Sequence, residues 1–365
     1  MNFEFATAAR IVFGAGKLKE LPAIAGEFGQ RALFVHSHSA LPAATASALP
    51  NCVLFPVAGE PTIELIRAGI RLAKQERCDV VVSLGGGSVL DAGKAIAVLV
   101  TNGGDPLDYA EVIGQGQAIT KPGLPFIAIP TTAGTGAEVT RNAVLFSPEH
   151  HVKVSLRGQH LLARVALVDP ELTYNLPPAI TANTGLDALT QLIEPFVSCR
   201  ANPLTDALCR EGMQRVARSL CRAYATGAPA ARADMALASL FGGLALANAG
   251  LGAVHGFAAP LGGMYDAPHG ALCAALLPAV MTVNERSLQR LGGSLALQRF
   301  EEVRQIVGDL AEFGQALGVK PLRELGVRRA EFPVIIEKAA AASSMKGNPI
   351  QLTPAQLGEI LDLAW

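Results

Sequence analysis

The 365-residue chain has few charged residues and no excess of either sign. Charged residues make up 17% of the sequence, hydrophobic residues make up 50%, and the formal net charge is −1 at pH 7. Because no basic excess exists to neutralise phosphates, we expect no nucleic-acid partner. The length exceeds that at which a single hydrophobic core stops growing, so two domains are expected.

The sequence also lacks paired cysteines. Its six cysteines are scattered and form no Cys-x-x-Cys pair: Cys52, Cys78, Cys199, Cys209, Cys221 and Cys273. This usage disfavours a disulfide framework or a zinc finger and suits reduced thiols in a cytoplasm. The first residues carry no basic segment followed by an apolar run, so a secretory signal is not expected. We therefore predict a cytoplasmic protein.

Charge is absent from residues 235–265, a length that could span a bilayer. The segment is interrupted by Gly242-Gly243 and Gly250, carries Asn248 and His255, and ends in a proline-containing loop. These interruptions favour a buried helix of a soluble protein over a membrane span. We expect no membrane partner.

The first half of the chain alternates apolar strands with amphipathic helices. Residues 1–16 are expected to form an edge strand and a turn, and residues 62–72 a helix. Four segments have the composition of buried strands: residues 31–36, 52–57, 79–84 and 125–129. Such alternation predicts an α/β domain built on a doubly wound parallel sheet.

Beyond the tandem proline Pro177-Pro178 only helices are expected. We therefore predict an α/β domain over residues 1–178 and an all-α domain over residues 179–365. Residues 235–249 are expected to form a central helix. Outer helices are expected at residues 298–317 and 353–364.

Three glycines, Gly85 to Gly87, lie between the predicted strand 79–84 and a following helix. A backbone without side chains approaches an anion closely, and the helix presents free N–H groups to it. This predicts a phosphate-binding turn, with an unliganded glycine turn as the alternative. Residues 130–140, rich in hydroxyls and glycines, follow strand 125–129 and either bind a pyrophosphate or ribose or form an ordinary loop. A hairpin is expected over residues 142–156.

Two imidazoles, His255 and His269, occur in surroundings almost free of charge. Asp187 and Gln191 are four residues apart, so on a helix both project from the same face. These four side chains could surround one divalent cation. Two histidines satisfied within a core are the alternative.

Four motifs in this order resemble the iron-containing (group III) alcohol dehydrogenase family: Gly85-Gly86-Gly87-Ser88-x-x-Asp91-x-x-Lys94, Pro130-Thr131-Thr132-Ala133-Gly134-Thr135-Gly136-x-Glu138, Asp187-Ala188-Leu189-Thr190, and His255-Gly256 leading to Pro268-His269-Gly270. The resemblance implies an N-terminal dinucleotide-binding α/β domain and a helical C-terminal domain, the fold shared with dehydroquinate synthase. It implies reversible, metal-assisted hydride transfer in the interdomain cleft between NAD(P)(H) and an alcohol, aldehyde or ketone. It also implies a homodimer.

The resemblance further implies residue roles. The dinucleotide would be bound by Gly86, Gly87, Ser88, Asp91, Thr131, Thr132, Thr135, Asn142 and Lys153. The metal, Fe²⁺ or Zn²⁺, would be bound by Asp187, Gln191, His255 and His269. No general base is assigned.

The sequence departs from the family pattern at three positions. Gln191 stands where the family carries histidine, and a neutral amide is the weaker ligand, so we expect lower metal affinity or an empty site. Ala259 replaces a histidine of many members. Ser37 replaces the aspartate that binds the ribose 2′-hydroxyl in NAD-preferring members, so Ser37 is expected near the ribose and NADP is admissible.

These departures leave other functions open. One alternative is a metal-independent reductase similar to maleylacetate reductase. A dehydroquinate-synthase-like lyase and a non-catalytic dinucleotide-binding relative are the others.

Overall fold

The computed structural model describes residues 2–37, 42–49 and 51–365, which form two compact units. The α/β unit comprises Ala6–Thr132 and Gly136–Thr173. The helical unit comprises Tyr174–Trp365 together with two short segments, residues 2–5 and Ala133–Thr135. The sequence places the division at Pro178, whereas the contacts place it at Tyr174 and assign these two short segments to the helical unit.

The α/β unit is built on a six-stranded parallel sheet with the order β1-β8-β5-β4-β2-β3. Its strands are β1 (Arg10–Phe13), β2 (Ala32–Ser37), β3 (Val53–Val57), β4 (Val80–Gly85), β5 (Phe126–Pro130) and β8 (Val165–Val168). An antiparallel hairpin, β6 (Asn142–Ser147) and β7 (Val152–Arg157), lies outside the sheet. The doubly wound α/β fold is therefore confirmed.

Strands β2 to β5 lie within one residue of the four predicted segments. The expected strand over residues 1–16 is confined to β1, which pairs in parallel with β8. The sequence interpretation missed β8, a run of four apolar residues that ends at Asp169-Pro170. A run that short does not distinguish a strand from a helix segment by periodicity.

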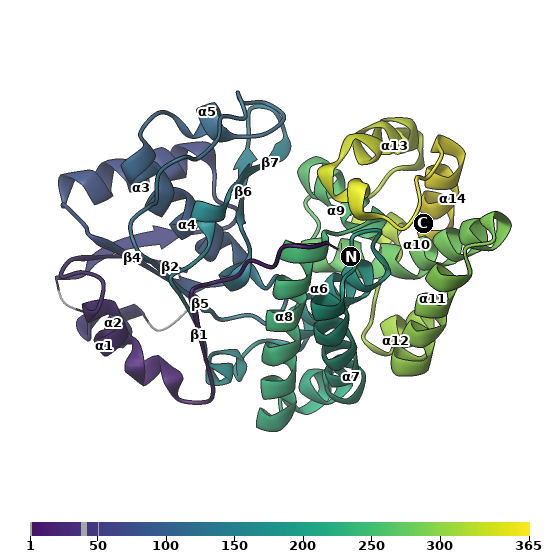
Figure 1. Cartoon of the computed structure of the whole chain (residues 1–365), viewed down its shortest axis with the longest axis horizontal. Coiled ribbons are helices and arrows are strands. Elements are labelled where there is room, and N and C mark those ends of the chain that lie inside the picture. Colours follow the sequence, from purple (N-terminus) through teal and green to yellow (C-terminus); the bar gives the residue numbers. More distant parts are fainter. Residues whose placement is uncertain (1, 38–41, 50) are drawn as a thin grey trace. The chain divides into compact units, whose positions relative to one another are not determined.

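Helices cover both faces of the sheet (Figure 1). They are α1 (Leu21–Gly26), α2 (Pro42–Ser47), α3 (Ile63–Gln75) and α4 (Gly87–Asn102), and the one-turn helix α5 (Pro106–Tyr109) packs against α3. Phe34, Val82 and Ile127 are register neighbours on the face packed by α1 and α2. On the other face, a Cβ at Gly93 of α4 would lie 1.9 Å from the Ser83 hydroxyl, so only glycine lets α4 approach β4 this closely.

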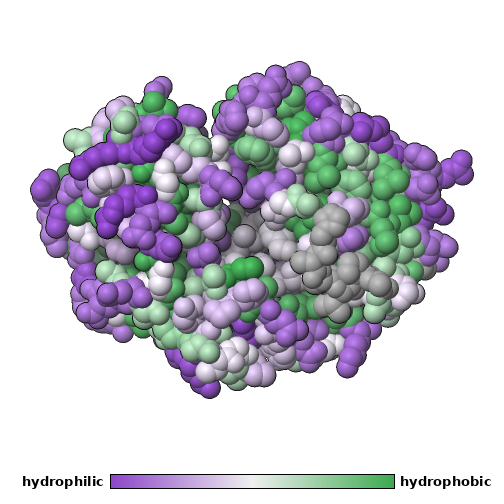
Figure 2. Space-filling view, turned by 180° about the vertical axis from the view of Figure 1, so that it is seen from behind, coloured by the Kyte–Doolittle hydropathy of each residue, from purple (hydrophilic) through white to green (hydrophobic). Residues whose placement is uncertain are grey.

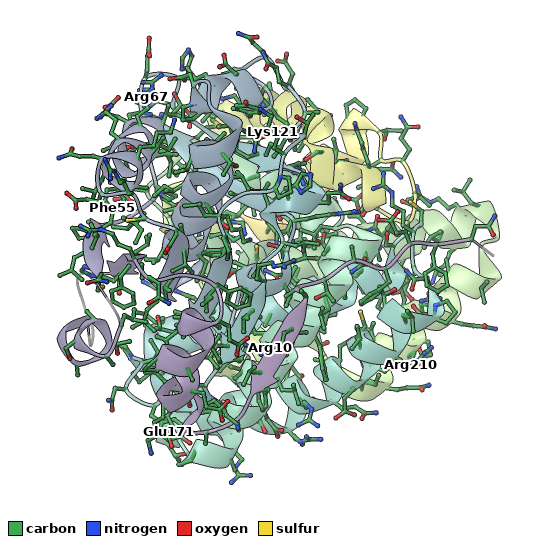
Figure 3. All side chains as sticks on the ribbon, turned by 60° about the vertical axis from the view of Figure 1, so that its left-hand side comes forward. Arg10, Phe55, Arg67, Lys121, Glu171 and Arg210 are labelled. Carbon is green, nitrogen blue, oxygen red and sulfur yellow. The ribbon has the colours of Figure 1, made fainter. Side chains whose placement is uncertain are left out.

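Ion pairs tie surface elements of this unit together. Arg67 on α3, labelled in Figure 3, donates from Nε and Nη2 to the two carboxylate oxygens of Asp105 at 2.6 and 2.9 Å. Asp105 is also the N-cap of α5, so the pair fixes the start of that helix against α3.

The helical unit contains the remaining long helices. They are α6 (Pro178–Val197), α7 (Pro203–Thr226), α8 (Pro229–Ala249), α9 (Ala253–Met264), α10 (His269–Leu291), α11 (Ser294–Val307), α12 (Leu310–Ala316), α13 (Phe332–Ala341) and α14 (Pro354–Ala364). The core is formed by buried apolar residues from α6 to α10 and from α11, α13 and α14.

Helix α8 contains the predicted apolar helix over residues 235–249 and packs against α6 and α7. Within the described residues it is the one helix long and apolar enough to cross a membrane, and 67% of its apolar window is buried inside the protein. Its apolar character is thus accounted for by packing.

On the face drawn in Figure 2, hydrophilic residues surround scattered apolar patches.

The prediction of a single outer helix over residues 298–317 is wrong. Gly308 adopts φ 83° after α11, and the Asp309 side chain then caps α12 by accepting from the N–H groups of Ala311 and Glu312 at 2.8 and 2.9 Å. A glycine followed by an N-capping aspartate ends one helix and starts another. The helix expected over residues 353–364 is confirmed as α14, with Thr353 as its N-cap.

Candidate functional site

Asp187 and Gln191 project from the same face of α6 and are both buried. Gln191 donates from Nε2 to Asp187 Oδ2 at 3.0 Å. A Cβ at Gly242 would lie 3.3 Å from the Gln191 Cβ, so a glycine on α8 leaves room for the amide. The spacing of four residues thus brings the carboxylate and the carboxamide into direct contact.

His255 on α9 and His269 at the start of α10 converge on the same carboxylate. Asp187 Oδ1 lies 3.4 Å from His255 Nε2 and 3.8 Å from His269 Nε2. The two ring centroids are 5.4 Å apart. The structure therefore brings together all four side chains that the sequence predicts as metal ligands.

A fifth side chain, Cys273, completes the group and was missed by the sequence interpretation. Its Sγ lies 3.9 Å from His255 Nε2 and 3.7 Å from His269 Nε2. One donor atom each from Asp187, His255, His269 and Cys273 lies within 4.8 Å of the others. The available signal was the His269-x-x-x-Cys273 spacing, which places both side chains on one face of α10.

Glu194, also missed, orients one of the imidazoles. Its Oε2 lies 2.6 Å from His255 Nδ1, and its Oε1 accepts from the Val254 N–H at 2.7 Å. A carboxylate on Nδ1 turns Nε2 toward Asp187, the arrangement by which proteins orient metal-binding histidines. Glu194 is seven residues after Asp187, so the same helical face supplies both carboxylates.

The electrostatics of this group favour opposite charges placed side by side. Burial alone would lower the pKa of His255, yet Cys273, Asp187 and Glu194 raise it well above its ordinary value. Burial alone would raise the pKa of Asp187, but the neighbouring imidazoles of His255 and His269 lower it. The buried carboxylate is therefore kept ionised.

Two buried oxygens of this group, Asp187 Oδ1 and Gln191 Oε1, accept no hydrogen bond from the described residues. A buried acceptor without a donor is costly, and an ion bound beside Asp187 Oδ1 would remove that cost. Carboxylate, imidazole and thiolate are the donors that divalent zinc and iron take. The residues present therefore fit a divalent cation.

In the α/β unit, the predicted phosphate-binding residues lie at the carboxyl edge of the sheet. Helix α4 starts at Gly87, and no side chain caps its N-terminus. The Thr131 N–H donates to Gly85 O at 3.0 Å, and a Cβ at Gly86 would lie 3.5 Å from the Thr132 side chain. The glycine turn and the threonine loop are thus adjacent, with the N–H groups of Gly87 and Ser88 at the open helix end.

Ser37 is the last residue of β2, which pairs with β4 on the side opposite to β5. Between β2 and β4 the strand order reverses direction, because β3 lies outside β2 whereas β5 lies beyond β4. Such a switch point is where open α/β sheets bind dinucleotides. The edge formed by β2, β4 and β5 therefore fits a dinucleotide.

Asp91 is held inside the unit. Its Oδ2 accepts from the Val144 N–H at 3.0 Å, and its Oδ1 pairs with Lys94 Nζ at 3.4 Å. Lys94, which the sequence interpretation did not assign, also donates to Thr140 Oγ1 and Asn142 O, each at 2.8 Å. Burial lowers the pKa of Lys94 and raises that of Asp91. These contacts anchor α4 to the hairpin.

Two further predicted residues lie elsewhere. Lys153 on β7 donates to Glu60 Oε1 at 2.9 Å. Thr135 belongs to the helical unit together with Ala133 and Gly134. Contact of either residue with a dinucleotide stays a prediction.

Comparisons with known proteins match both units. The model of the family described as iron-containing alcohol dehydrogenase matches residues 8–170, and the model of the Fe-containing alcohol dehydrogenase family, C-terminal, matches residues 181–365. The chain is 39% identical over 313 residues to alcohol dehydrogenase 4 of Saccharomyces cerevisiae (strain ATCC 204508 / S288c), covering 84% of this chain and 81% of the relative. It is 38% identical over 295 residues to 1,3-propanediol dehydrogenase of Klebsiella pneumoniae, covering 78% and 75%. A crystal structure of 1,3-propanediol oxidoreductase superposes with a TM-score of 0.90 at 32% identity, covering 100% of both chains.

Proposed function

Because the chain belongs to the iron-containing alcohol dehydrogenase family and is a metal-assisted oxidoreductase of alcohols and aldehydes, we propose how its own residues serve that reaction. Asp187, His255 and His269 hold a divalent cation, and the edge formed by β2, β4 and β5 binds NAD(H) or NADP(H). The dehydrogenases among the relatives do not favour a maleylacetate-reductase-like enzyme or a lyase.

One observation carries the metal assignment. The buried Asp187 Oδ1 accepts no hydrogen bond from the described residues, although two imidazole nitrogens lie 3.4 and 3.8 Å from it. A cation at this place satisfies the oxygen and both nitrogens at once. When bound, the cation supplies Lewis-acid polarisation of a substrate oxygen, and the nicotinamide supplies or accepts the hydride.

The protein residues orient and shield this centre. Glu194 holds the His255 ring by Nδ1, so that Nε2 faces Asp187. The Asp187 carboxylate offsets positive charge, and the buried surroundings of Asp187 and His255 exclude water, which strengthens electrostatic interactions. His269 is more exposed, with 33% of its side chain accessible, so it lies on the side of the group that solvent reaches.

For the dinucleotide, we place the pyrophosphate at the open N-terminus of α4. The N–H groups of Gly87 and Ser88 would donate to it, with Gly86 allowing the close approach and Thr131 and Thr132 adding hydroxyls. Asp91 would act indirectly by anchoring α4 through Lys94 and Val144. Ser37 presents no carboxylate to repel a 2′-phosphate, so both NAD and NADP are accepted.

We place the substrates among small primary alcohols, diols and their aldehydes, in line with the alcohol and propanediol dehydrogenases to which the chain is similar. A cytoplasmic homodimer is proposed as well. All six cysteines are free thiols, which suits a reducing compartment.

The test uses the purified full-length protein. NAD⁺ and NADP⁺ are each mixed with ethanol, 1-propanol and 1,3-propanediol after loading with Fe²⁺ or Zn²⁺, and formation of the reduced nicotinamide is followed by absorbance. Activity that falls on chelation and returns with added metal is expected. Absence of turnover with every combination, or full activity after complete metal removal, would contradict the proposal.

A further inference from the structure

Two side chains are candidates for the fourth ligand of a cation bound by Asp187, His255 and His269. Gln191 is the ligand that the sequence predicts, and Cys273 is the side chain that the fold adds. We propose that Cys273 is the fourth protein ligand and that Gln191 is a positioning residue for Asp187. This inference rests on the proposed function only in requiring that a divalent cation binds here.

The Gln191 amide is turned the wrong way to bind a cation shared with the imidazoles. Its Nε2, which carries hydrogens and has no free lone pair, donates to Asp187 Oδ2 at 3.0 Å. Its Oε1 lies against α8, 3.7 Å from the position that a Cβ at Gly242 would take. By holding Oδ2, Gln191 leaves Asp187 Oδ1 facing His255 and His269. Contacts of this kind orient ligands without binding the metal.

The nitrogen–oxygen and nitrogen–sulfur distances of this group are close to those of a tetrahedral zinc site. Ordinary zinc bond lengths and tetrahedral angles give edges of roughly 3.4 Å between nitrogen and oxygen and roughly 3.6 Å between nitrogen and sulfur. The corresponding distances from Asp187 Oδ1 to the imidazole nitrogens are 3.4 and 3.8 Å, and those from Cys273 Sγ are 3.9 and 3.7 Å. Each of these four distances agrees with its tetrahedral edge to within a few tenths of an ångström.

The surroundings of Cys273 also favour a ligand over an ordinary core thiol. The residue is fully buried, and its sulfur lies against two imidazole nitrogens. Cys209 on α7 is equally buried in the same unit but does not belong to the group of donor atoms. Burial alone therefore does not distinguish the two cysteines, whereas the neighbouring donors do.

The donor set predicts which metal is preferred. One carboxylate and one thiolate together offset the two positive charges of the cation, and a thiolate is a soft ligand that favours zinc over ferrous ion. Zinc also expands from four to five ligands, so four protein donors do not by themselves close the site. With Cys273 as a ligand, the donor set therefore favours zinc over ferrous ion.

The experiment uses the full-length protein, stripped with a chelator and reloaded with Co²⁺ as the probe. A thiolate bound to Co²⁺ gives an intense near-ultraviolet charge-transfer band that oxygen and nitrogen ligands do not give. We expect this band in the unsubstituted protein, in the matched control Cys209→Ser and in Gln191→Ala. It should be lost in Cys273→Ser and Cys273→Ala, with Co²⁺ affinity lower on the order of 100-fold. Circular dichroism identifies any variant that has not folded, and the two replacements of Cys273 check each other.

Three outcomes would overturn the inference. One bound Co²⁺ per chain without the band would remove Cys273 from the site and leave the metal-assisted function intact. Loss of Co²⁺ in Gln191→Ala, with retention in Cys273→Ser, would assign the fourth place to Gln191. Absence of Co²⁺ binding together with metal-independent alcohol oxidation would overturn the proposed metal centre as well, so the parallel activity assay separates the two failures.

Discussion

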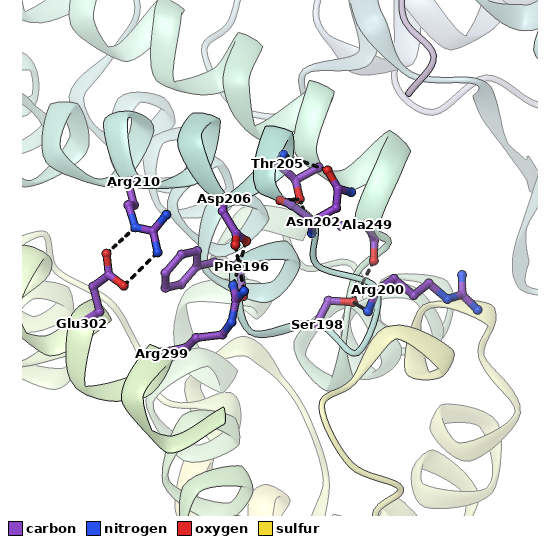
Figure 4. A network of polar contacts seen from close by, with 10 residues as sticks. All are labelled: Phe196, Ser198, Arg200, Asn202, Thr205, Asp206, Arg210, Ala249, Arg299 and Glu302. Carbon is purple, nitrogen blue, oxygen red and sulfur yellow. Dashed lines mark hydrogen bonds and ion pairs between the residues drawn. The ribbon is translucent and has the colours of Figure 1, made fainter. Parts of the chain in front are cut away.

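The helical unit contains two polar clusters that differ in how their charges are satisfied. The metal cluster consists of Asp187, Gln191, His255, His269 and Cys273. The arginine cluster joins α6, α7 and α11 and consists of Phe196, Asp206, Arg210, Arg299 and Glu302 (Figure 4). Both are assembled from segments far apart in the sequence.

In the arginine cluster the protein supplies every partner that the central pair needs. Arg299 donates to both oxygens of Asp206 at 2.7 Å each and to Phe196 O at 2.6 Å. Its guanidinium also lies 5.0 Å from the centre of the Phe196 ring. In the metal cluster, by contrast, one oxygen each of Asp187 and Gln191 has no donor among the described residues. A cluster complete in itself stabilises a junction between helices, whereas the open Asp187 Oδ1, beside two imidazoles and a thiol, leaves a place for a cation.

The largest effect is expected from Asp187→Asn. The substitution keeps the shape but removes the charge that faces both imidazoles, so metal content should fall and kcat/KM should drop by at least about 100-fold. Elemental analysis and the alcohol oxidation assay measure both. Asp206→Asn is the matched control, because it removes the carboxylate that pairs with Arg299 in the arginine cluster and should leave the metal content unchanged. Equal metal loss in the two variants would remove the distinction between the clusters.

Arg299→Ala should lower the stability of the fold and leave metal binding unchanged. Leaving the buried Asp206 carboxylate without its partner is expected to cost about 3 kcal/mol of unfolding free energy while metal binding persists. Chemical denaturation followed by circular dichroism provides the measurement. Arg304→Ala serves as its control, because Arg304 lies in a more exposed ion-pair network on α11 and should cost less than about 1 kcal/mol. Equal destabilisation by the two substitutions would mean that the arginine cluster contributes no more than surface charge.

Glu138 extends the comparison to the α/β unit. Burial raises its pKa from the ordinary value to about 7. A carboxyl whose pKa is raised on folding stabilises the fold fully below its unfolded pKa, and that contribution is lost as the pH rises to the folded pKa. Stability should therefore fall between about pH 4.5 and 7, by at most about 3 kcal/mol, and Glu138→Gln should flatten this dependence. Denaturation midpoints across this range measure it. Identical pH profiles for the two proteins would show that Glu138 ionises normally.

The smallest effect is expected from Gln191→His. Because Cys273 already fills the fourth place, the zinc affinity should change by less than about tenfold, as measured by competition with a chromophoric chelator. A gain of 100-fold or more would mean that the fourth place had been vacant and would support Gln191 as a position for a direct ligand. Gln191→Ala in the same titration shows how much the orienting hydrogen bond contributes.

Local signals predicted much of the α/β unit. The positions of β2 to β5 followed from short apolar segments, and the open start of α4 followed from three adjacent glycines. The helical unit was predicted less well. The sequence marks the break at Gly308-Asp309 with a glycine followed by an N-capping residue. The prediction of one helix disregards these two signals, whereas the structure has two helices.

The candidate site, like the fold, was predictable from the sequence only in part. Helical spacing alone places Asp187 beside Gln191. It also places Glu194 two turns from Asp187 and Cys273 one turn from His269, each pair on one helical face. Spacing does not say which faces of α6, α9 and α10 meet. That depended on packing between helices, which placed the thiol of Cys273 against both imidazoles and turned the Gln191 amide toward α8. The sequence by itself determined which chemical groups are present and which share a helical face, and only the tertiary structure decided which of them point at the same place.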